Sequence, residues 1–436
     1  MRAAGSSAPA PPTRVAVIGA GFAGLATSWH LLRRAREEGR AVDLTLIDAA
    51  GIAAGASGAS AGLLHPLTPR GGLLWRGAEG VAATLALAEE ASRFEDGVVA
   101  GRGILRPARD GKQDGQFRAK WADPPPPPPR GRAPPRPSDG VPPGSVSYVP
   151  AEGIPRAVPG AAPRPADAPG GLLVECGAVL VPHKYLRGLW AACRAEAAAG
   201  AAGSRAALRA GGPAVRSARG DLPGYDHVVV AAGAASAAVE ECRGLPLQFC
   251  HGVTVEMAPA GPGAARYAGA SLLGPSYIAR HGDGRIVVGA TKEYGGSAED
   301  AAAAVGQGLG WQWPPAPAPG GRGGPGAYGG AVEALEGAAR ALWGPAERWG
   351  TVLVRAGVRG LPPRTPRGAL PLLGRVGGPA GGDGPAVWVV AGLGSRGLVY
   401  HALAGSVMAE AVLRDDPGAI PPELGQWAAA AGDPGP

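Results

Sequence analysis

Three glycines and one aspartate near the start of the chain have the residue types and spacing that a dinucleotide site needs. Gly19, Gly21 and Gly24 form a GxGxxG pattern, and Asp48 follows further along the chain. The first glycine permits a tight turn, the second lets the backbone approach a pyrophosphate, and the third lets a helix pack against a strand. A carboxylate at the position of Asp48 can accept hydrogen bonds from ribose hydroxyls. The pattern therefore predicts a bound dinucleotide.

These residues need a strand, a helix and a second strand to position them, and the flanking sequence has that order. Residues 15–18 are apolar and precede the turn, large apolar residues recur at helical spacing over 25–32, and residues 44–47 are again strand-like. The free N–H groups and the positive dipole end of the helix would face the phosphates. An αβ turn without a ligand is the alternative for any glycine-rich segment, and the two flanking strands favour the dinucleotide.

The composition limits the class of protein. The 436-residue chain contains 75 Gly and 47 Pro and is long enough to bury a core. The four cysteines show no CxxC pair and no metal-ligand spacing with histidine, so neither a disulfide framework nor a metal site is expected. The longest uncharged stretch, 49–69, is broken by Gly, Ser and Pro, and we expect no membrane span there.

The net charge of +7 does not by itself indicate nucleic-acid binding. Segment 102–140 has nine Lys or Arg against four Asp, so it contributes +5 of the excess. A solvated insert is favoured over a nucleic-acid surface for such a low-complexity region. The first 14 residues contain no acid and would also suit the remnant of a transit peptide, which leaves localisation open between the cytoplasm and an organelle.

Segments rich in Gly, Pro and Ala separate the ordered parts of the chain. Residues 122–169 are predicted to be a disordered, extended Pro-rich insert, and 197–224 and 313–330 have a similar composition. The ordered parts are predicted to be a strand pair and a helix over 171–197, a strand over 225–236, antiparallel strands over 245–256 and 276–291, and a strand and helix over 386–392 and 398–413. Dinucleotide-type elements thus occur at the start, middle and end, which predicts a discontinuous cofactor domain.

Four local motifs within this arrangement resemble the D-amino-acid oxidase-type (DAO) family of FAD-dependent oxidoreductases. The motifs are GAGFAG at 19–24 with Asp48, GASGASAG at 55–62, VVVAAGA at 229–235, and AGVRGLPPRTPRGALPLLGRV at 356–376 followed by GLGSRGLVYHALAG at 392–405. The C-terminal pair is the most specific. It looks closest to the motifs of glycine oxidase and of the flavin domain of the bifunctional tRNA 5-methylaminomethyl-2-thiouridine enzyme.

The resemblance implies an α/β fold with a discontinuous Rossmann-like FAD-binding domain and an inserted α+β, antiparallel-sheet substrate domain. The oxidoreductase would span 14–413. The FAD-binding segments would be about 14–75, 171–236 and 350–413, the substrate domain about 76–121 and 237–349, and a tail would follow over 414–436.

The cofactor that the resemblance implies is noncovalent FAD, because the usual tethering sites lack a suitable residue. No cysteine lies in the C-terminal block, and no histidine lies within 49–62. The N–H groups of the turn at 392–397 can stabilise negative charge on the reduced flavin. The expected FAD-binding residues are Gly19, Ala20, Gly21, Phe22, Ala23, Gly24, Asp48, Ser57, Gly58, Ser60, Ala61, Gly62, Ala232, Gly233, Gly392, Gly394, Ser395, Arg396 and Gly397.

Three residues are candidates for substrate binding or catalysis. Arg359 occupies the position where the family holds the substrate carboxylate, and Arg396 occupies that of a second basic group near the flavin. An arginine fork matches two carboxylate oxygens, although arginines in Gly- and Pro-rich loops are commonly solvated. His65 follows the 55–62 loop, and the alternative for it is a structural histidine.

The resemblance implies oxidation of a carbon next to an amine nitrogen in an amino acid, an N-substituted glycine or a similar small amine. Hydride transfer to the flavin supplies the chemistry. Three alternatives remain: a carboxymethylaminomethyl group of tRNA as substrate, a flavoprotein without amine oxidase activity, and an NAD-dependent dehydrogenase. Arg367 before Gly368 replaces an acid of the family pattern, which favours the non-catalytic alternative. The motifs at 55–62 and 392–397 disfavour the NAD-dependent one. The substrate itself, the electron acceptor and the oligomeric state stay open.

Overall fold

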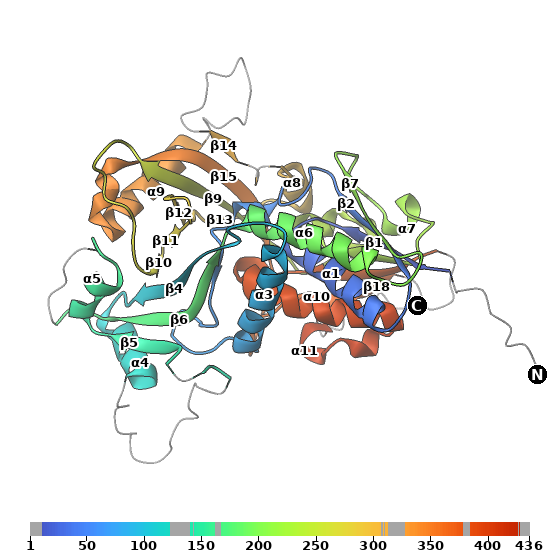
Figure 1. Cartoon of the computed structure of the whole chain (residues 1–436), viewed down its shortest axis with the longest axis horizontal. Helices are drawn as coiled ribbons and strands as arrows, with labels where there is room; N and C mark the ends of the chain where they lie inside the picture. The colour runs from blue at the N-terminus through green and yellow to red at the C-terminus, as the bar shows by residue number, and fades with distance from the viewer. Residues whose placement is uncertain are drawn as a thin grey trace, which may run out of the picture.

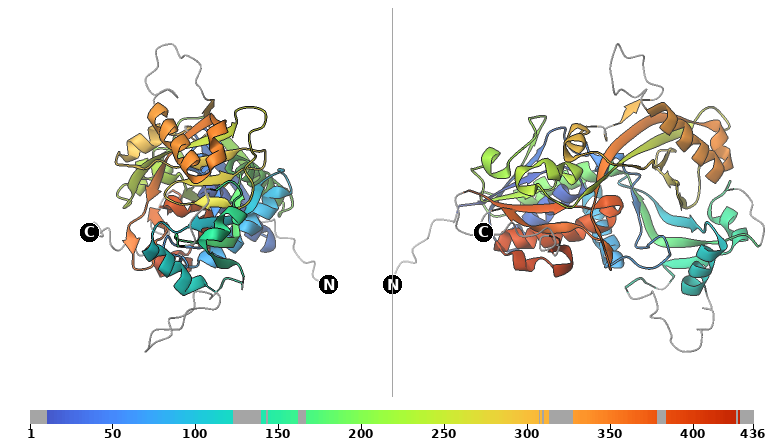
Figure 2. Two further views of the ribbon diagram at one scale, coloured as in Figure 1. Left: turned by 90° about the vertical axis from the view of Figure 1, so that its left-hand side faces the viewer. Right: turned by 180° about the vertical axis from the view of Figure 1, so that it is seen from behind.

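Two large β-sheets with their covering helices form most of the described part of the chain (Figure 1), and β16 (Arg364–Thr365) and β17 (Gly368–Ala369) make a third, two-stranded sheet. The computed structural model describes residues 11–122, 140–142, 144–161, 167–306, 308, 310–312, 328–377, 384–425 and 427. The two large sheets lie beside each other along the long axis, and the view from behind shows the same division (Figure 2). The predicted combination of a Rossmann-like sheet and an antiparallel sheet is confirmed.

Sheet A has six strands and contains the elements that the sequence predicts to bind a dinucleotide. Its order is β18 (Leu372–Gly377), β19 (Ala386–Ala391), β8 (His227–Val230), β1 (Thr13–Ile18), β2 (Val42–Asp48) and β7 (Arg205–Ala210). All neighbouring pairs are parallel except β18 with β19. Strands buried on both faces are continuously apolar, as residues 15–18 of β1 and 386–391 of β19 are. The sheet joins the start, middle and end of the chain, as the sequence predicted.

Helices cover both faces of sheet A. On one face α1 (Phe22–Glu37), α3 (Gly77–Ser92), α6 (Pro182–Ala198) and α10 (Gly397–Arg414) pack against one another. Val15 and Val17 point into this layer, whereas Ala16 and Ile18 point to the other face, where they meet Leu222 near α7 (Ala218–Asp221). This alternation follows from the twofold repeat of a strand. The end of β1 is therefore held between the hydrophobic cores on the two faces of sheet A.

Sheet B has eleven strands and is antiparallel except where β10 runs parallel to β4. Its main order is β14 (Trp311–Gln312), β15 (Trp349–Leu361), β9 (Gln248–Pro259), β12 (Ile286–Gly289), β11 (Tyr277–Arg280), β10 (Ser271–Leu273), β4 (Val99–Pro107), β6 (Gly171–Leu180) and β3 (Leu63–Leu64). In addition β13 (Glu293–Tyr294) pairs with β9, and β5 (Val146–Val149) pairs with β6.

The two faces of sheet B have different neighbours. One face packs on α9 (Gly329–Leu342) through Val255, Ile278 and Val288, which contact Val332 and Leu335 of the helix in one core. The opposite face turns toward sheet A. Residues that alternate with the core positions on these strands therefore face the junction of the two sheets.

Several predictions about segments are wrong in detail. Residues 171–180 form the single strand β6 rather than a strand pair, and β6 and β15 pair within sheet B although their segments were assigned to the FAD-binding domain. Strand pairing joins distant segments, so local sequence does not reveal it. Within the predicted disordered insert, β5 and α5 (Ile154–Ala157) are ordered. The proline run 124–129 lies outside the described residues.

The predicted tail begins as ordered structure. After α10 a short helix, α11 (Pro422–Gly425), follows, and the Trp427 indole donates a hydrogen bond of 2.9 Å to the Leu373 carbonyl of β18. The remaining short elements are α2 (Ala56–Ala59), α4 (Gly111–Trp121), α8 (Ala298–Ala303), β16 (Arg364–Thr365) and β17 (Gly368–Ala369). In the part of the chain that the structure describes, no helix combines the length and apolar character of a membrane span.

Candidate functional site

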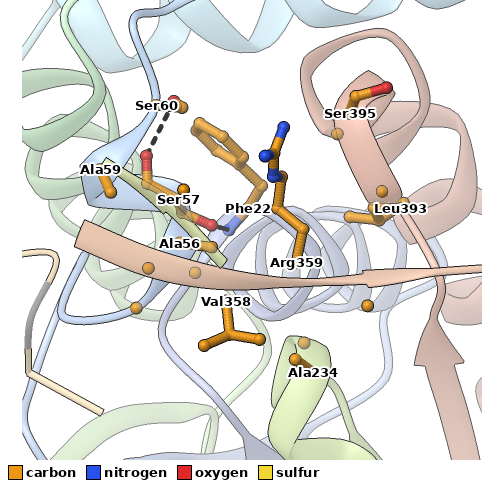
Figure 3. A pocket seen from close by; sticks show the side chains of 18 of the residues that line it. Phe22, Ala56, Ser57, Ala59, Ser60, Ala234, Val358, Arg359, Leu393 and Ser395 are labelled. Carbon is orange, nitrogen blue, oxygen red and sulfur yellow. Dashed lines mark hydrogen bonds between the residues drawn. The ribbon is translucent and has the colours of Figure 1, made fainter. Parts of the chain in front are cut away.

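A cavity of about 1120 Å³ lies between the carboxyl ends of the sheet A strands and the inner face of sheet B. Ligand pockets usually have volumes of roughly 300–1,000 Å³, so this one has room for a dinucleotide and a small second molecule. Figure 3 shows Phe22, Ser57, Arg359 and Ser395 around the space. The cavity is therefore lined by residues from the segments in which the sequence analysis predicted the cofactor and substrate sites.

The backbone of the glycine turn after β1 lies close to neighbouring backbone atoms, as the GxGxxG pattern predicts. Gly19 has φ of +107°, and a Cβ there would lie 2.5 Å from the Ala231 carbonyl oxygen. A Cβ on Gly24 would lie 1.8 Å from the Gly19 oxygen, so α1 packs directly on the turn. The Ser57 hydroxyl accepts a 3.1 Å hydrogen bond from the Phe22 N–H at the start of α1. The two predicted phosphate-binding segments thus hold each other.

Asp48 lines the cavity, and its carboxylate also organises the surrounding backbone. One oxygen accepts the Ala20 N–H at 2.8 Å, and the other accepts those of Ala50 at 2.9 Å and Gly51 at 2.8 Å. The sequence did not predict this role. Each carboxylate oxygen can accept more than one hydrogen bond. The backbone bonds of Asp48 are therefore compatible with the prediction that it also binds a ribose.

Side chains from three other elements hold the 55–62 loop by its carbonyl groups. A carbonyl oxygen only accepts, so each partner donates, and both histidines carry their proton on Nε2. Burial lowers the pKa of His183 to about 4 and also lowers that of His281, which keeps both rings neutral. The pairs are His183 Nε2 with Gly58 O at 3.1 Å, Thr254 Oγ1 with Ala59 O at 3.0 Å, and His281 Nε2 with Ala61 O at 3.4 Å.

The second glycine turn precedes α10 and is fixed from behind. Gly392 and Gly394 have φ of +67° and +54°, which favours glycine at both positions. His401 Nδ1 donates to the Gly397 carbonyl at 3.0 Å, so its Nε2 accepts the Tyr185 hydroxyl at 2.7 Å. Burial lowers the pKa of His401 to about 4, so the ring stays neutral. This buried pair holds the first turn of α10 toward the cavity.

Arg359 lies on the cavity face of β15 and points into the space (Figure 3). Its Nη2 donates to the Cys250 sulfur at 3.3 Å and to the Thr291 carbonyl at 3.4 Å. Among the described residues it forms no ion pair with a carboxylate. A Cβ on Gly252 would lie 2.9 Å from Nη2, so this glycine makes room for the guanidinium.

Tyr277 also lies on this face, and the sequence analysis missed it. A Cβ on Gly289 would lie 2.7 Å from its hydroxyl, so the side chain extends over Gly289. Burial raises the pKa of Tyr277 to about 12, and the Arg359 charge opposes part of that rise. The hydroxyl therefore stays protonated and can donate. Its only sequence signal was a tyrosine within an apolar strand, which does not indicate where the strand lies.

The other two candidate catalytic residues line the same cavity. Arg396 lies at the start of α10, and a Cβ on Gly368 would be 3.3 Å from its Nη1. His65 Nδ1 accepts the Leu67 N–H at 3.2 Å, so any ring proton lies on Nε2. Burial, with the charges of Arg106 and Arg396, lowers the pKa of His65 to about 3. His65 is thus neutral and a weak base.

Most of the predicted FAD-binding residues line the cavity, and three do not. Ala20, Gly24 and Gly58 lie behind its surface, where they support the turns through the contacts given above. The residues that do line it are Gly19, Gly21, Phe22, Ala23, Asp48, Ser57, Ser60, Ala61, Gly62, Ala232, Gly233, Gly392, Gly394, Ser395, Arg396 and Gly397. The crowded glycines and the two helix starts fit a bound pyrophosphate and flavin. Within the described ranges, no cluster of His, Cys, Asp or Glu is suited to a metal ion.

Solved structures share this fold. Glycine oxidase from Geobacillus kaustophilus superposes with a TM-score of 0.63 at 21% identity, over 92% of this chain and 95% of that one. Iminodiacetate oxidase from Chelativorans sp. BNC1 gives a TM-score of 0.64 at 20% identity, over 94% and 98%. L-proline dehydrogenase from P. horikoshii gives 0.66 at 13% identity, over 98% and 100%.

Sequence comparison defines the family. A stretch of 83 residues is 47% identical to the tRNA 5-methylaminomethyl-2-thiouridine biosynthesis bifunctional protein of Maricaulis maris (strain MCS10). This stretch covers 19% of the chain and only 12% of that relative. Residues 14–411 match the sequence profile of the family described as FAD dependent oxidoreductase. The chain therefore belongs to the DAO family of FAD-dependent oxidoreductases.

Proposed function

We propose that the FAD of this oxidoreductase lies across the cavity, from the turn after β1 to the turn before α10. Gly21, Ala23 and Ser57, which line the cavity, would lie against the pyrophosphate together with the start of α1. The turn at 392–397 would face the flavin ring, where the start of α10 stabilises negative charge. The close backbone contacts of Gly19 and the Ser57 bond to Phe22 support this placement.

We further propose that the chain oxidises the carbon next to the amine nitrogen of a small amine that carries a carboxylate. The observation that carries this proposal is the Arg359 guanidinium, which forms no ion pair among the described residues, near the protonated Tyr277 hydroxyl on the cavity face of sheet B. Bound FAD supplies the hydride acceptor. Arg359 would bind the carboxylate in a bidentate manner, and Tyr277 would donate a further hydrogen bond to it.

His65 and Arg396 would shape the reaction from the flavin side. His65 stays neutral because its pKa is about 3, so it adds no charge that would repel a cationic amine. Its Nε2 carries the ring proton, because Nδ1 is the acceptor toward Leu67, and it forms no hydrogen bond with the described residues. Arg396 would place positive charge near the flavin as electrons arrive there.

A tRNA substrate is the second candidate, and the match to the Maricaulis maris protein favours it. A carboxymethylaminomethyl group is itself an N-substituted glycine, so Arg359 and Tyr277 would serve it in the same way. In a small amine the reacting group is nearly the whole molecule, whereas in tRNA it is attached to a large nucleic acid. Assays with each substrate alone therefore distinguish the two candidates.

Anaerobic bleaching of the bound flavin tests the proposal. We expect sarcosine, glycine, D-proline or hypomodified tRNA to bleach the yellow protein. Arg359→Ala should keep the flavin spectrum and weaken carboxylate binding by roughly 10- to 150-fold, since a hydrogen bond to a charged group contributes about 1.5–3 kcal/mol. The exposed Arg364→Ala is the matched control.

Three outcomes would contradict parts of the proposal. A flavoprotein that neither amines nor tRNA bleach would support the non-catalytic alternative. Bleaching by tRNA alone would select the second candidate. Loss of FAD from Arg359→Ala would show that this residue holds the fold or the cofactor rather than the substrate.

A further inference from the structure

Arg106 is a further cationic side chain on the cavity wall. Its Nη1 forms a single long hydrogen bond, 3.5 Å to the Pro69 carbonyl. Among the described residues Arg106 forms no ion pair. A guanidinium has five N–H donors, so most of its hydrogen-bonding capacity is available to a ligand.

The register of sheet B places Arg106 on the same face as Tyr277. Leu105 pairs with Leu272, and Leu272 pairs with Ile278; these three side chains are buried in the core on the α9 side. Their neighbours one position along, Arg106 and Tyr277, therefore point to the opposite face. Both line the cavity.

The same register gives the separation of the two side chains. Strand β10 lies between β4 and β11, so the backbones of Arg106 and Tyr277 are two strand spacings apart, about 10 Å. An arginine side chain is long enough to close much of that gap. Two anionic groups of one small molecule can thus contact Arg106 and the Tyr277–Arg359 pair together.

The described charged residues that line this part of the cavity, Arg106, Arg109 and Arg359, are basic. The acidic residues that line the cavity, Asp48, Glu240 and Glu299, belong to β2, a 3-10 turn after β8, and α8. No acid on β4, β10 or β11 lines it. Burial and repulsion by Arg109 lower the pKa of Arg106 to about 10, and Arg106 in turn lowers that of His65. Arg106 therefore lies within electrostatic reach of His65, whose pKa Arg396 at the start of α10 also lowers.

We propose that Arg106 binds a second carboxylate of the substrate, so that the preferred substrate is an amine bearing two carboxylates. This inference rests on the proposed function, because it takes the Tyr277–Arg359 pair as the site of the first carboxylate. A planar guanidinium binds one carboxylate through two parallel hydrogen bonds. Pairing with an anion also offsets the cost of a partly desolvated, unpaired charge.

Binding of thioether analogues to the FAD-loaded protein tests the inference. Methylthioacetate carries one carboxylate, whereas thiodiacetate and 3-(carboxymethylthio)propanoate carry two at different spacings. Dissociation constants come from the perturbation of the visible flavin spectrum. We expect one or both dianions to bind at least tenfold more tightly than methylthioacetate.

Variants then assign that preference to a residue. Arg106→Gln should remove the preference for the dianion and change the affinity for methylthioacetate by less than threefold. Arg102→Gln, an exposed arginine on the same strand that does not line the cavity, should keep the preference. Equal binding of all three analogues by the unaltered protein, or a preference that survives Arg106→Gln, would overturn the inference.

The failure of the inference and that of the proposed function are distinguishable. Sarcosine that bleaches the flavin, together with no preference for dianions, overturns the Arg106 assignment alone. A dianion preference with no bleaching by any amine supports the Arg106 assignment and rejects the oxidation.

Discussion

Substitution of Gly252 by alanine tests the placement of Arg359 most directly. It removes none of the side chains that are proposed to contact the substrate. The new Cβ would lie 2.9 Å from Arg359 Nη2 and 3.1 Å from the Thr291 carbonyl oxygen. The guanidinium is the flexible end of a long side chain, so it moves more readily than the backbone. We expect Arg359 to shift by several tenths of an ångström away from its position in the cavity.

The magnitude follows from the type of interaction that is disturbed. A hydrogen bond to a charged group contributes about 1.5–3 kcal/mol to binding. Complete loss of the bond would cost the upper value. A displaced guanidinium should lose about 1.5 kcal/mol, which is roughly a tenfold rise in the dissociation constant of methylthioacetate. Removal of a strand glycine tends to stabilise the chain by about 0.5–1 kcal/mol, so the unfolding temperature should change little.

A double-mutant cycle assigns the effect to Arg359. Gly252→Ala is measured alone and in the Arg359→Gln background, where it should add almost nothing to the dissociation constant. Gly350→Ala on β15 is the control, because its added Cβ meets no described residue within 4 Å apart from its chain neighbours. An unchanged affinity in a folded Gly252→Ala protein, or an equal loss in both backgrounds, would refute the placement of Arg359.

Two further predictions concern pH and the cofactor. Burial lowers the pKa of His65 to about 3 and that of His183 to about 4. The unfolded chain therefore binds protons at these histidines more readily than the folded chain does. The folded state is not penalised by this difference above about pH 6.5, and its free energy of unfolding decreases as the pH falls below that value. The urea midpoint should fall from pH 7 to pH 5, and a double His65→Asn, His183→Asn variant should show a smaller fall; an identical fall would contradict this account. Asp48→Asn exchanges one acceptor oxygen for an NH₂ group, so it should weaken FAD binding at least tenfold in a flavin-fluorescence assay, whereas Asp43→Asn on the same strand should bind FAD normally.

Local features of the sequence determined the cofactor half of the molecule. The turn at 19–24, the loop at 55–62 and the turn at 392–397 are recognisable because glycine positions and neighbouring strand residues follow one another along the chain. The apolar strands of sheet A were recognisable for the same reason. The DAO family, its FAD and the combination of two sheet types could therefore be predicted before any coordinates.

The resemblance already placed Arg359 at the expected substrate site, whereas only the tertiary structure placed Tyr277 and Arg106 on the same cavity wall. Arg359, Tyr277 and Arg106 come from three strands whose order and register in sheet B follow no local pattern. Side chains alternate between the faces of a strand, so a register shift of one residue would bury Arg106 and expose Leu105. Strand pairing across distant segments sets that register. The sequence thus determined that a flavin is bound, and the pairing of distant strands decided which charged side chains line the cavity.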